Sequence, residues 1–138
     1  MVDFNTFINK KITEIKRIDK KGAFTKHLSR GLCIGVNENE KYLVIAVKRL
    51  RLICELLSYD EVSEIFPRFE INDIALDEHN DNAIYDFLDY FLGQQIISIR
   101  FHNDINNSNK SFFLMITNNF KLGFDNSGYI EIDNRDNN

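Results

Sequence analysis

The segment at 40–58 constrains the fold more than any other part of the chain, because it is apolar over most of its length. At about 100° per residue, its charged side chains fall into one wedge of a helix, and Arg49 alone lies well outside that wedge. A helix that is apolar on most of its circumference has to be covered on several sides, so the pattern predicts the central helix of a core. The alternative is a buried strand at 42–47, paired with 32–36 across a turn at 37–41.

Apolar residues at steps of three and four predict further helices on both sides of this segment. These helices fall at 3–21, at 23–31, at 60–66 and at 80–92. The segment at 3–21 combines an apolar stripe with a basic polar face, which is the pattern of a basic amphipathic helix.

Two of the helix starts are marked by the spacing of a capping box. Asn37 and Glu40 precede the central helix, and Ser58 and Glu61 precede the short helix that Pro67 ends. In a capping box, each of the two side chains accepts a hydrogen bond from the backbone N–H of the other residue. We therefore expect a helix to begin at both places.

The period of the pattern changes from helical to two after Gln95. Apolar and polar residues then alternate in four runs, separated by turn residues such as Asn118 and Asn119. The sequence therefore predicts an α+β fold, in which about four to five N-terminal helices pack on one face of a C-terminal four-stranded antiparallel β-meander. The predicted organisation is a single domain over 1–138, with a helical part at 1–93, the β-meander at 94–133 and a frayed tail at 134–138.

The formal net charge of −4 conceals a strong division along the chain. Residues 1–54 carry a net charge of +7, residues 55–94 a net charge of −10 and residues 95–138 a net charge of −1. Such a division points to a charged partner. It has a second explanation, in which the basic and acidic parts face each other in the fold and neutralise each other.

Residues suited to catalysis or metal binding are few and scattered. Cys33 and Cys54 both stand in apolar surroundings, which predicts reduced, buried thiols in a cytoplasmic protein. Neither cysteine has metal-ligand spacing to the other or to a histidine, and no phosphate-binding or nucleophile motif occurs. We therefore predict a protein that is not an enzyme and that needs no metal or cofactor. Neither a signal-peptide pattern nor an apolar run near the ~20 residues of a membrane span occurs, so no membrane partner is expected.

The acidic part of the chain is the predicted partner-binding surface. Carboxylates repel nucleic acid and attract a basic protein, and tyrosines among them supply contact area. Nucleic acid is therefore not expected on this surface. The residues assigned to it are Asp73, Asp77, Glu78, Asp81, Tyr85, Asp86, Asp89 and Tyr90.

The outer face of the meander is a second candidate interface. An apolar cluster on a sheet face either contacts a partner or is covered by another segment, and the sequence leaves both open, together with the oligomeric state. The residues assigned to this face are Ile96, Phe113, Met115 and Tyr129, beside Arg100 and Lys121.

The layout of residues 80–133 resembles a known class of proteins. The run LGQQIISI at 92–99 leads into the hairpins, and an Asn-Ser-Gly turn follows at 126–128. This pattern resembles immunity proteins of bacterial polymorphic and contact-dependent growth inhibition toxins. The resemblance implies a non-enzymatic inhibitor that binds one cognate toxin domain, often a nuclease with a basic active-site cleft.

Two other functions stay open at this point. The basic segment at 3–21 and the charges at 41–51 suit a module that binds nucleic acid or another anionic surface, with an affinity that falls steeply with salt. The third is an enzyme whose site is assembled from dispersed residues.

Overall fold

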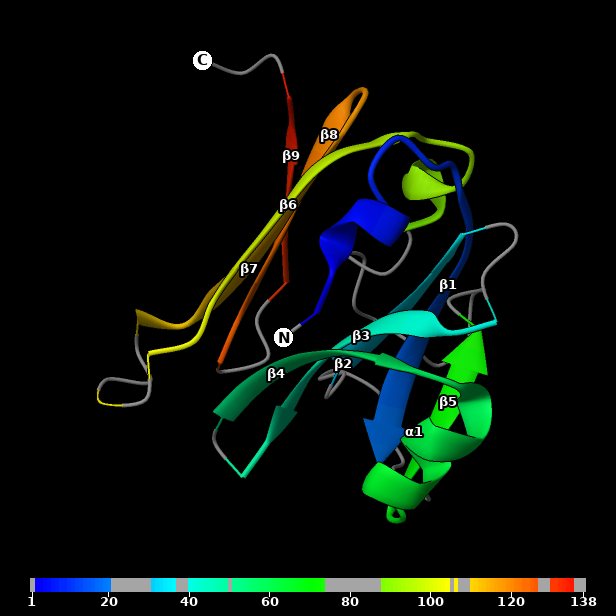
Figure 1. Cartoon of the computed structure of the whole chain (residues 1–138), viewed down its shortest axis with the longest axis vertical. Coiled ribbons are helices and arrows are strands. Elements are labelled where there is room, and N and C mark those ends of the chain that lie inside the picture. Colours follow the sequence, from blue (N-terminus) through cyan, green and yellow to red (C-terminus); the bar gives the residue numbers. More distant parts are fainter. Residues whose placement is uncertain are drawn as a thin grey trace.

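The described residues of the chain fold into two antiparallel sheets, one short α-helix and two 3-10 helices (Figure 1). The computed structural model describes residues 2–20, 31–36, 40–49, 51–73, 88–104, 106, 110–126 and 130–135. The elements are η1 (Phe4–Thr6), β1 (Ile12–Lys20), β2 (Gly31–Val36), β3 (Tyr42–Lys48), β4 (Arg51–Leu57), α1 (Tyr59–Ile65), β5 (Phe69–Asp73), η2 (Leu88–Phe91), β6 (Ile96–His102), β7 (Phe112–Thr117), β8 (Phe120–Asp125) and β9 (Ile130–Asn134). The first sheet has the strand order β4-β3-β2-β1-β5, and the second is the meander β6-β7-β8-β9.

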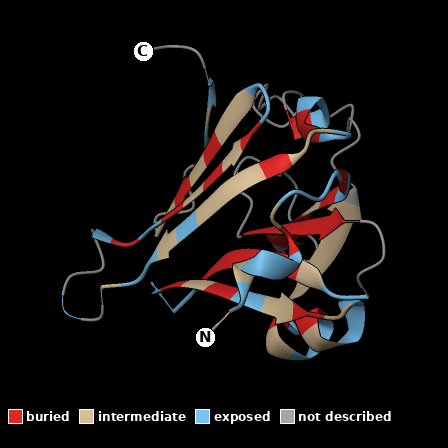
Figure 2. Ribbon diagram, turned by 45° about the horizontal axis from the view of Figure 1, so that its top comes forward, coloured by how far each residue is buried: buried red, intermediate tan, exposed pale blue. Residues whose placement is uncertain are grey.

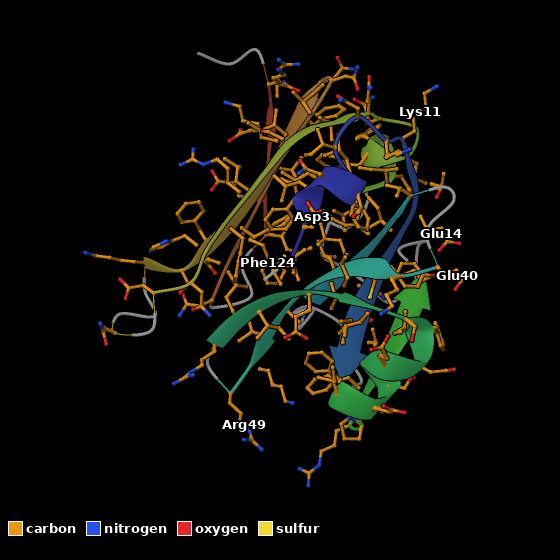
Figure 3. All side chains as sticks on the ribbon, in the orientation of Figure 1. Asp3, Lys11, Glu14, Glu40, Arg49 and Phe124 are labelled. Atoms are coloured by element: carbon orange, nitrogen blue, oxygen red, sulfur yellow. The ribbon has the colours of Figure 1, made fainter. Side chains whose placement is uncertain are left out.

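The first sheet is buried on both faces at its centre (Figure 2). Leu43 and Ile45 of β3 belong to the larger core cluster between the sheets, where Figure 3 shows Phe124 of β8. Val44 and Ala46 lie on the opposite face, in a smaller cluster beneath α1. Strands covered on both faces have to be apolar on both faces, which is why β2 and β3 are continuous apolar runs.

This mainly β architecture contradicts the predicted α+β fold of helices on a meander. Residues 40–58 form the hairpin β3–β4 in place of a central helix. The alternative, a buried strand at 42–47 paired with 32–36, is confirmed. Lys48 and Arg51 are cross-strand partners next to the turn of the hairpin, and both are exposed there. They are charged because the tip of the hairpin is exposed to solvent, and not because they lie on the polar face of a helix.

The other predicted helices have separate outcomes. The helix at 60–66 is confirmed as α1, whereas the segment at 3–21 forms η1 and β1. The predicted helix at 23–31 lies outside the described residues, except that Gly31 begins β2, and of 80–92 only the end, with η2, is described. No helix in the described part of the chain is long and apolar enough to cross a membrane.

α1 begins at the capping box that the sequence predicts. Ser58 Oγ accepts from the Glu61 N–H at 3.2 Å, and Glu61 Oε1 accepts from the Ser58 N–H at 3.0 Å. These hydrogen bonds lower the pKa of the Glu61 carboxyl. Pro67 follows the end of the helix, as predicted. The capping box predicted from Asn37 and Glu40 is wrong, because Glu40 precedes strand β3 and Asn37 lies outside the described residues.

The shape of β1 explains why its sequence imitates a helix. A β-bulge between Ile12 and Glu14 shifts the strand by one residue, so that Ile12 and Ile15 both join the larger core cluster. Ile18 lies on the opposite face, in the cluster beneath α1. Apolar steps of three therefore arise from a bulge combined with burial on both faces.

β1 also buries two charges. Arg17 Nε lies 2.8 Å from Asp19 Oδ2, and the two side chains are 1% and 2% exposed. Asn72 of β5 donates to the same Asp19 oxygen at 2.9 Å. A buried ion pair needs such additional hydrogen bonds, because each charge has lost its water. The basic amphipathic helix predicted at 3–21 is therefore wrong in its geometry, and Arg17 of its predicted polar face is buried, whereas Lys10 and Lys11 are exposed.

A short junction ties the two sheets together. Residues 9–12 run beside residues 93–96, and four backbone hydrogen bonds of 2.8–2.9 Å join them. Asn9 and Gly93 have φ angles of 67° and 82°, a left-handed conformation that asparagine and glycine tolerate. The segment that precedes β1 is thereby hydrogen-bonded to the segment that precedes β6, and the two sheets pack around the larger core cluster.

The predicted C-terminal meander is confirmed as β6–β9, but the faces of its second strand are reversed. Ile96, Phe113 and Met115, which the sequence analysis assigns to an exposed outer patch, are buried. Tyr129, from the same predicted patch, lies outside the described residues. The strand FFLMIT is apolar in all but its last residue, so alternation does not determine which face points inward.

Gly31 allows β2 and β3 to approach each other closely. A Cβ at this position would meet the carbonyl oxygen of Ile45 and lie 2.6 Å from Cβ of Ala46. At Gly123 in β8, a Cβ would make only ordinary contacts at 3.8 Å. Gly31 is therefore required by close packing, and Gly123 is not.

We predict that Gly31→Ala lowers the free energy of unfolding by about 1–3 kcal/mol, since the strands have to move apart. Gly123→Ala is the matched control and should change the free energy of unfolding by less than about 0.5 kcal/mol. Urea unfolding followed by circular dichroism measures both. Equal stability of the two variants would show that β2 and β3 are not packed this closely.

Both cysteine thiols are free and buried, on opposite faces of the first sheet. Cys33 lies beneath α1, and Cys54 faces the second sheet. Burial raises the pKa of each thiol to about 12, because a thiolate would lose its hydration. A buried neutral thiol is a poor nucleophile, so neither cysteine suits covalent catalysis.

Because the unfolded thiol ionises near pH 9 and the folded one near 12, Cys33 should stabilise the fold below pH 9 and lose this contribution as the pH rises. The difference in unfolding free energy between wild type and Cys33→Ala should shrink above pH 9 by about 1.4 kcal/mol per pH unit. Val44→Ala, at the paired position in β3, is the control and should show a difference that does not depend on pH. Parallel curves for the wild type and Cys33→Ala would refute the shift.

Candidate functional site

The structure describes few of the residues predicted to bind a partner. Asp77, Glu78, Asp81, Tyr85 and Asp86 lie outside the described residues. Asp73, Asp89 and Tyr90 lie inside them. The described residues therefore do not test whether the predicted partner-binding residues form one surface.

Asp89 and Tyr90 are adjacent and exposed in η2. The Tyr90 ring is 57% exposed and stacks on Phe120 of β8, with centroids 6.0 Å apart and planes at 22°. Asp73 ends β5 and is opposite Lys16 of β1 in the backbone register. β1 of the basic part therefore runs beside β5 of the acidic part, as the second explanation of the charge division requires.

A pocket of about 500 Å³ lies beside the tip of the β3–β4 hairpin. Residues 47–49, at the end of β3, line one part, and residues 65–69, which lead from α1 into β5, line the other. The helix has seven residues and is roughly 10 Å long, whereas a seven-residue strand such as β3 extends about 23 Å. α1 is therefore too short to cover the whole face on which it packs, and the pocket forms beyond its C-terminal end.

The floor of the pocket is apolar and aromatic. Phe66 is 3% exposed and meets Phe69 edge to face, with ring centroids 6.0 Å apart and planes at 86°. Ile65 and Pro67 complete the apolar lining, and the pocket also borders Val47, whose side chain belongs to the larger core cluster. Such a floor favours contact with a ring or another apolar group.

Lys48, Arg49 and Arg68 surround this floor. Lys48 Nζ lies 5.9 Å from the centroid of the Phe66 ring, a position in which a cation is attracted to the ring face. Arg49 has a left-handed φ of 52° at the hairpin turn, and Figure 3 shows its side chain directed outward from the tip. Across the described ranges, none of these three cations forms an ion pair with a carboxylate.

At the opposite end of α1, the charged side chains form an ion pair and a side-chain hydrogen bond. Lys41 Nζ lies 3.5 Å from Glu61 Oε1. Tyr42 donates a hydrogen bond of 2.6 Å to Glu14 Oε2, and burial together with this bond raises the pKa of the Tyr42 hydroxyl. The polar groups at that end are paired with each other, whereas the cations at the pocket end form no ion pair with any carboxylate that the structure describes.

Part of this pocket is visible in the sequence. The charges at 41–51, which include Lys48 and Arg49, are candidate binding residues there, although the pattern predicts that they lie on a helix. Arg68 and the two phenylalanines were missed, because they lie about 20 residues further along the chain and only the turn after α1 brings them beside the hairpin. A cation that directly follows the helix-ending Pro67 is the one signal that could have indicated Arg68.

Within the described part of the chain, no three histidine, cysteine or acidic side chains are grouped so that they could hold a metal ion. No known protein family, no curated protein and no solved structure matches this chain. The likeness to immunity proteins therefore stays a prediction, and function has to be argued from the geometry of the pocket and the exposed surfaces.

Proposed function

We propose that the protein is a binding module for a ligand that joins a phosphate group to an apolar ring, a molecule about the size of a mononucleotide. The observation that carries this proposal is a set of three cations around an aromatic floor, Lys48, Arg49 and Arg68, none of which forms an ion pair with a carboxylate among the described residues. A volume of about 500 Å³ is within the usual range for small-molecule sites.

The chemistry of the lining favours phosphate over a carboxylate. Each arginine presents a planar fork of donors that matches two phosphate oxygens, and the lysine adds a compact point charge. Three cations are better neutralised by a dianion than by a monoanion. An attached ring would pack on Phe69 and Pro67 and would exclude water from the charged contacts, which strengthens them.

The same lining favours binding over catalysis. The described residues that line the pocket contribute no carboxylate, imidazole, thiol or hydroxyl side chain. General acid–base and nucleophilic catalysis draw on those groups most often. A role in recognition therefore fits the described lining better than a role in turnover.

An anionic aromatic dye, anilinonaphthalene sulfonate, tests the pocket, because its fluorescence rises in apolar surroundings. We expect the native protein to bind the dye and a mononucleotide to displace it. Arg68→Glu and Lys48→Glu should each weaken dye and nucleotide binding by about tenfold or more, since a charge-assisted hydrogen bond becomes a repulsion.

Lys11→Glu is the matched control, because it makes the same charge change far from the hairpin tip (Figure 3). Equal weakening by Lys11→Glu, or unchanged binding in Arg68→Glu, would rule out the pocket. If single-stranded oligonucleotides displace the dye and mononucleotides do not, the ligand is a nucleic acid, and the logarithm of the affinity should then fall linearly with the logarithm of salt concentration.

As a second candidate, we propose that the protein inhibits a basic toxin domain, such as a nuclease, through the segment that contains Asp89 and Tyr90. The exposure of these two side chains next to each other supports this candidate. An exposed tyrosine whose ring is held by Phe120 loses little conformational freedom on contact, and a neighbouring carboxylate attracts a basic partner.

Co-purification from cells that carry the native operon, followed by mass spectrometry, identifies a partner for this test. Asp89→Lys should weaken the affinity for that partner by about tenfold, mostly through slower association and at low salt. Asp60→Lys, an equally exposed position in α1, is the control and should leave the affinity unchanged. Unchanged affinity in Asp89→Lys would remove this segment from the interface.

A further inference from the structure

The outer face of the second sheet carries an apolar stripe between two charged edges. On β7, Phe112 is 36% exposed, and Leu114 and Ile116 are half-buried. Arg100 and His102 of the edge strand β6 hold the Phe112 ring, with Arg100 Cζ 5.9 Å and the His102 ring 5.8 Å from its centroid. No described element covers this face, which lies on the side away from the first sheet (Figure 2).

The two edges of this face have opposite charge. Arg100 and His102 are exposed on β6, and Glu131 and Asp133 are exposed on β9, at the other edge. None of the four forms an ion pair with another described residue. The face is therefore basic along β6, apolar along β7 and acidic along β9, and β8 presents Lys121, Gly123 and Asp125 between the apolar stripe and the acidic edge.

The strand register arranges these side chains in rows that run across the sheet. One row contains Arg100, Leu114, Gly123 and Glu131, which are successive cross-strand partners. The cation Arg100 and the anion Glu131 stand at the two ends of this row. Between them, the bulky apolar Leu114 stands next to Gly123, which has no side chain. A face built this way is complementary to a copy of itself turned by 180° about an axis parallel to the strands.

We propose that this face is the interface of a homodimer, with a second copy of the chain as its occupant. With the two-fold axis parallel to the strands and between β7 and β8, β6 of one copy lies over β9 of the other. Arg100 then meets Glu131 of the second copy, and Leu114 fits the space above Gly123 of the second copy. Face-to-face sheets pack in this aligned manner, with their strand directions within about 30° of each other, and an isologous interface forms each contact twice.

The charge pattern also selects this axis over the alternative. A two-fold axis perpendicular to the strands would place β6 over β6 and β9 over β9. Cations would then face cations and carboxylates would face carboxylates, a juxtaposition that suppresses association. Only the axis parallel to the strands brings opposite charges together at both edges.

Charge reversals at the two ends of the row test the proposal. The wild type should form a concentration-dependent dimer in analytical ultracentrifugation. Arg100→Glu and Glu131→Arg should each raise the dimer dissociation constant by about tenfold or more, because each places like charges opposite one another twice per dimer.

A mixture of the two single variants gives the sharpest result. One variant has carboxylates at both edges and the other has cations at both edges, so the two should form a heterodimer although neither dimerises well alone. The double variant Arg100→Glu/Glu131→Arg should recover the homodimer. Leu114→Glu should abolish it, and Arg51→Glu, on the first sheet, is the control that should leave it intact.

A monomeric wild type at the highest soluble concentration would overturn the proposal. So would single variants that dimerise as well as the wild type, or that fail to associate when mixed. Circular dichroism of each variant separates loss of the dimer from loss of the fold. The pocket at the β3–β4 tip lies on a different sheet, so binding of the dye and binding of a second copy succeed or fail independently.

Discussion

Coverage of the first sheet on both faces is the constraint on which the rest of the structure depends. The central strands β2 and β3 bury side chains toward the second sheet and toward α1 alike, so the sheet is the middle layer of three. The centre of a middle layer has no face left for polar side chains, which is why the two buried charges described on it, Arg17 and Asp19, are bonded to each other. The two outer layers follow from the same requirement: one is a sheet, and the other is a helix of seven residues.

The two outer layers differ in how completely they cover the middle one, and this difference positions the candidate sites. Backbone hydrogen bonds between residues 9–12 and 93–96 join the second sheet to the first, and the inner faces of the two sheets share one core cluster. α1 is shorter than the strands beneath it, so apolar surface beyond its end is reached from solvent. The pocket forms there because the helix ends at Pro67 before the hairpin does, and the hairpin tip contributes cations that the core does not accept.

The sequence predicts the parts of this fold that are exposed on one side and fails where both sides are covered. The meander has one solvated face, so period-two alternation was visible, and the capping box of Ser58 and Glu61 is a local signal that needs no tertiary context. Residues 40–58 gave no alternation, because a strand buried on both faces is as uniformly apolar as a buried helix. In β1, the bulge near Glu14 produced apolar steps of three, and no local feature of the sequence marks that bulge. Only the part of the pocket at 47–49 could be predicted, for a related reason: residues 47–49 and 65–69 become neighbours only through the packing of α1 on the sheet.

The division of charge along the chain is a poor guide to binding until the fold shows which charges are already paired. β1, from the basic part, runs beside β5, from the acidic part, and Lys41 reaches Glu61, so some of the division is used inside the molecule. The charges that matter for recognition are those whose neighbours in space carry no opposite charge. Within the part of the chain that the structure describes, Lys48, Arg49 and Arg68 meet that condition around an apolar floor, although Lys48 and Arg49 come from the basic part of the chain and Arg68 from the acidic part. On the second sheet, which is almost neutral in total, Arg100 stands on the edge strand β6 and Glu131 on the opposite edge strand β9, with Leu114 and Gly123 between them, so these two charges do not pair within one copy. The net charge of that sheet therefore does not indicate a binding surface. The positions of Arg100 and Glu131 at its two edges are what make its outer face complementary to a second copy of itself.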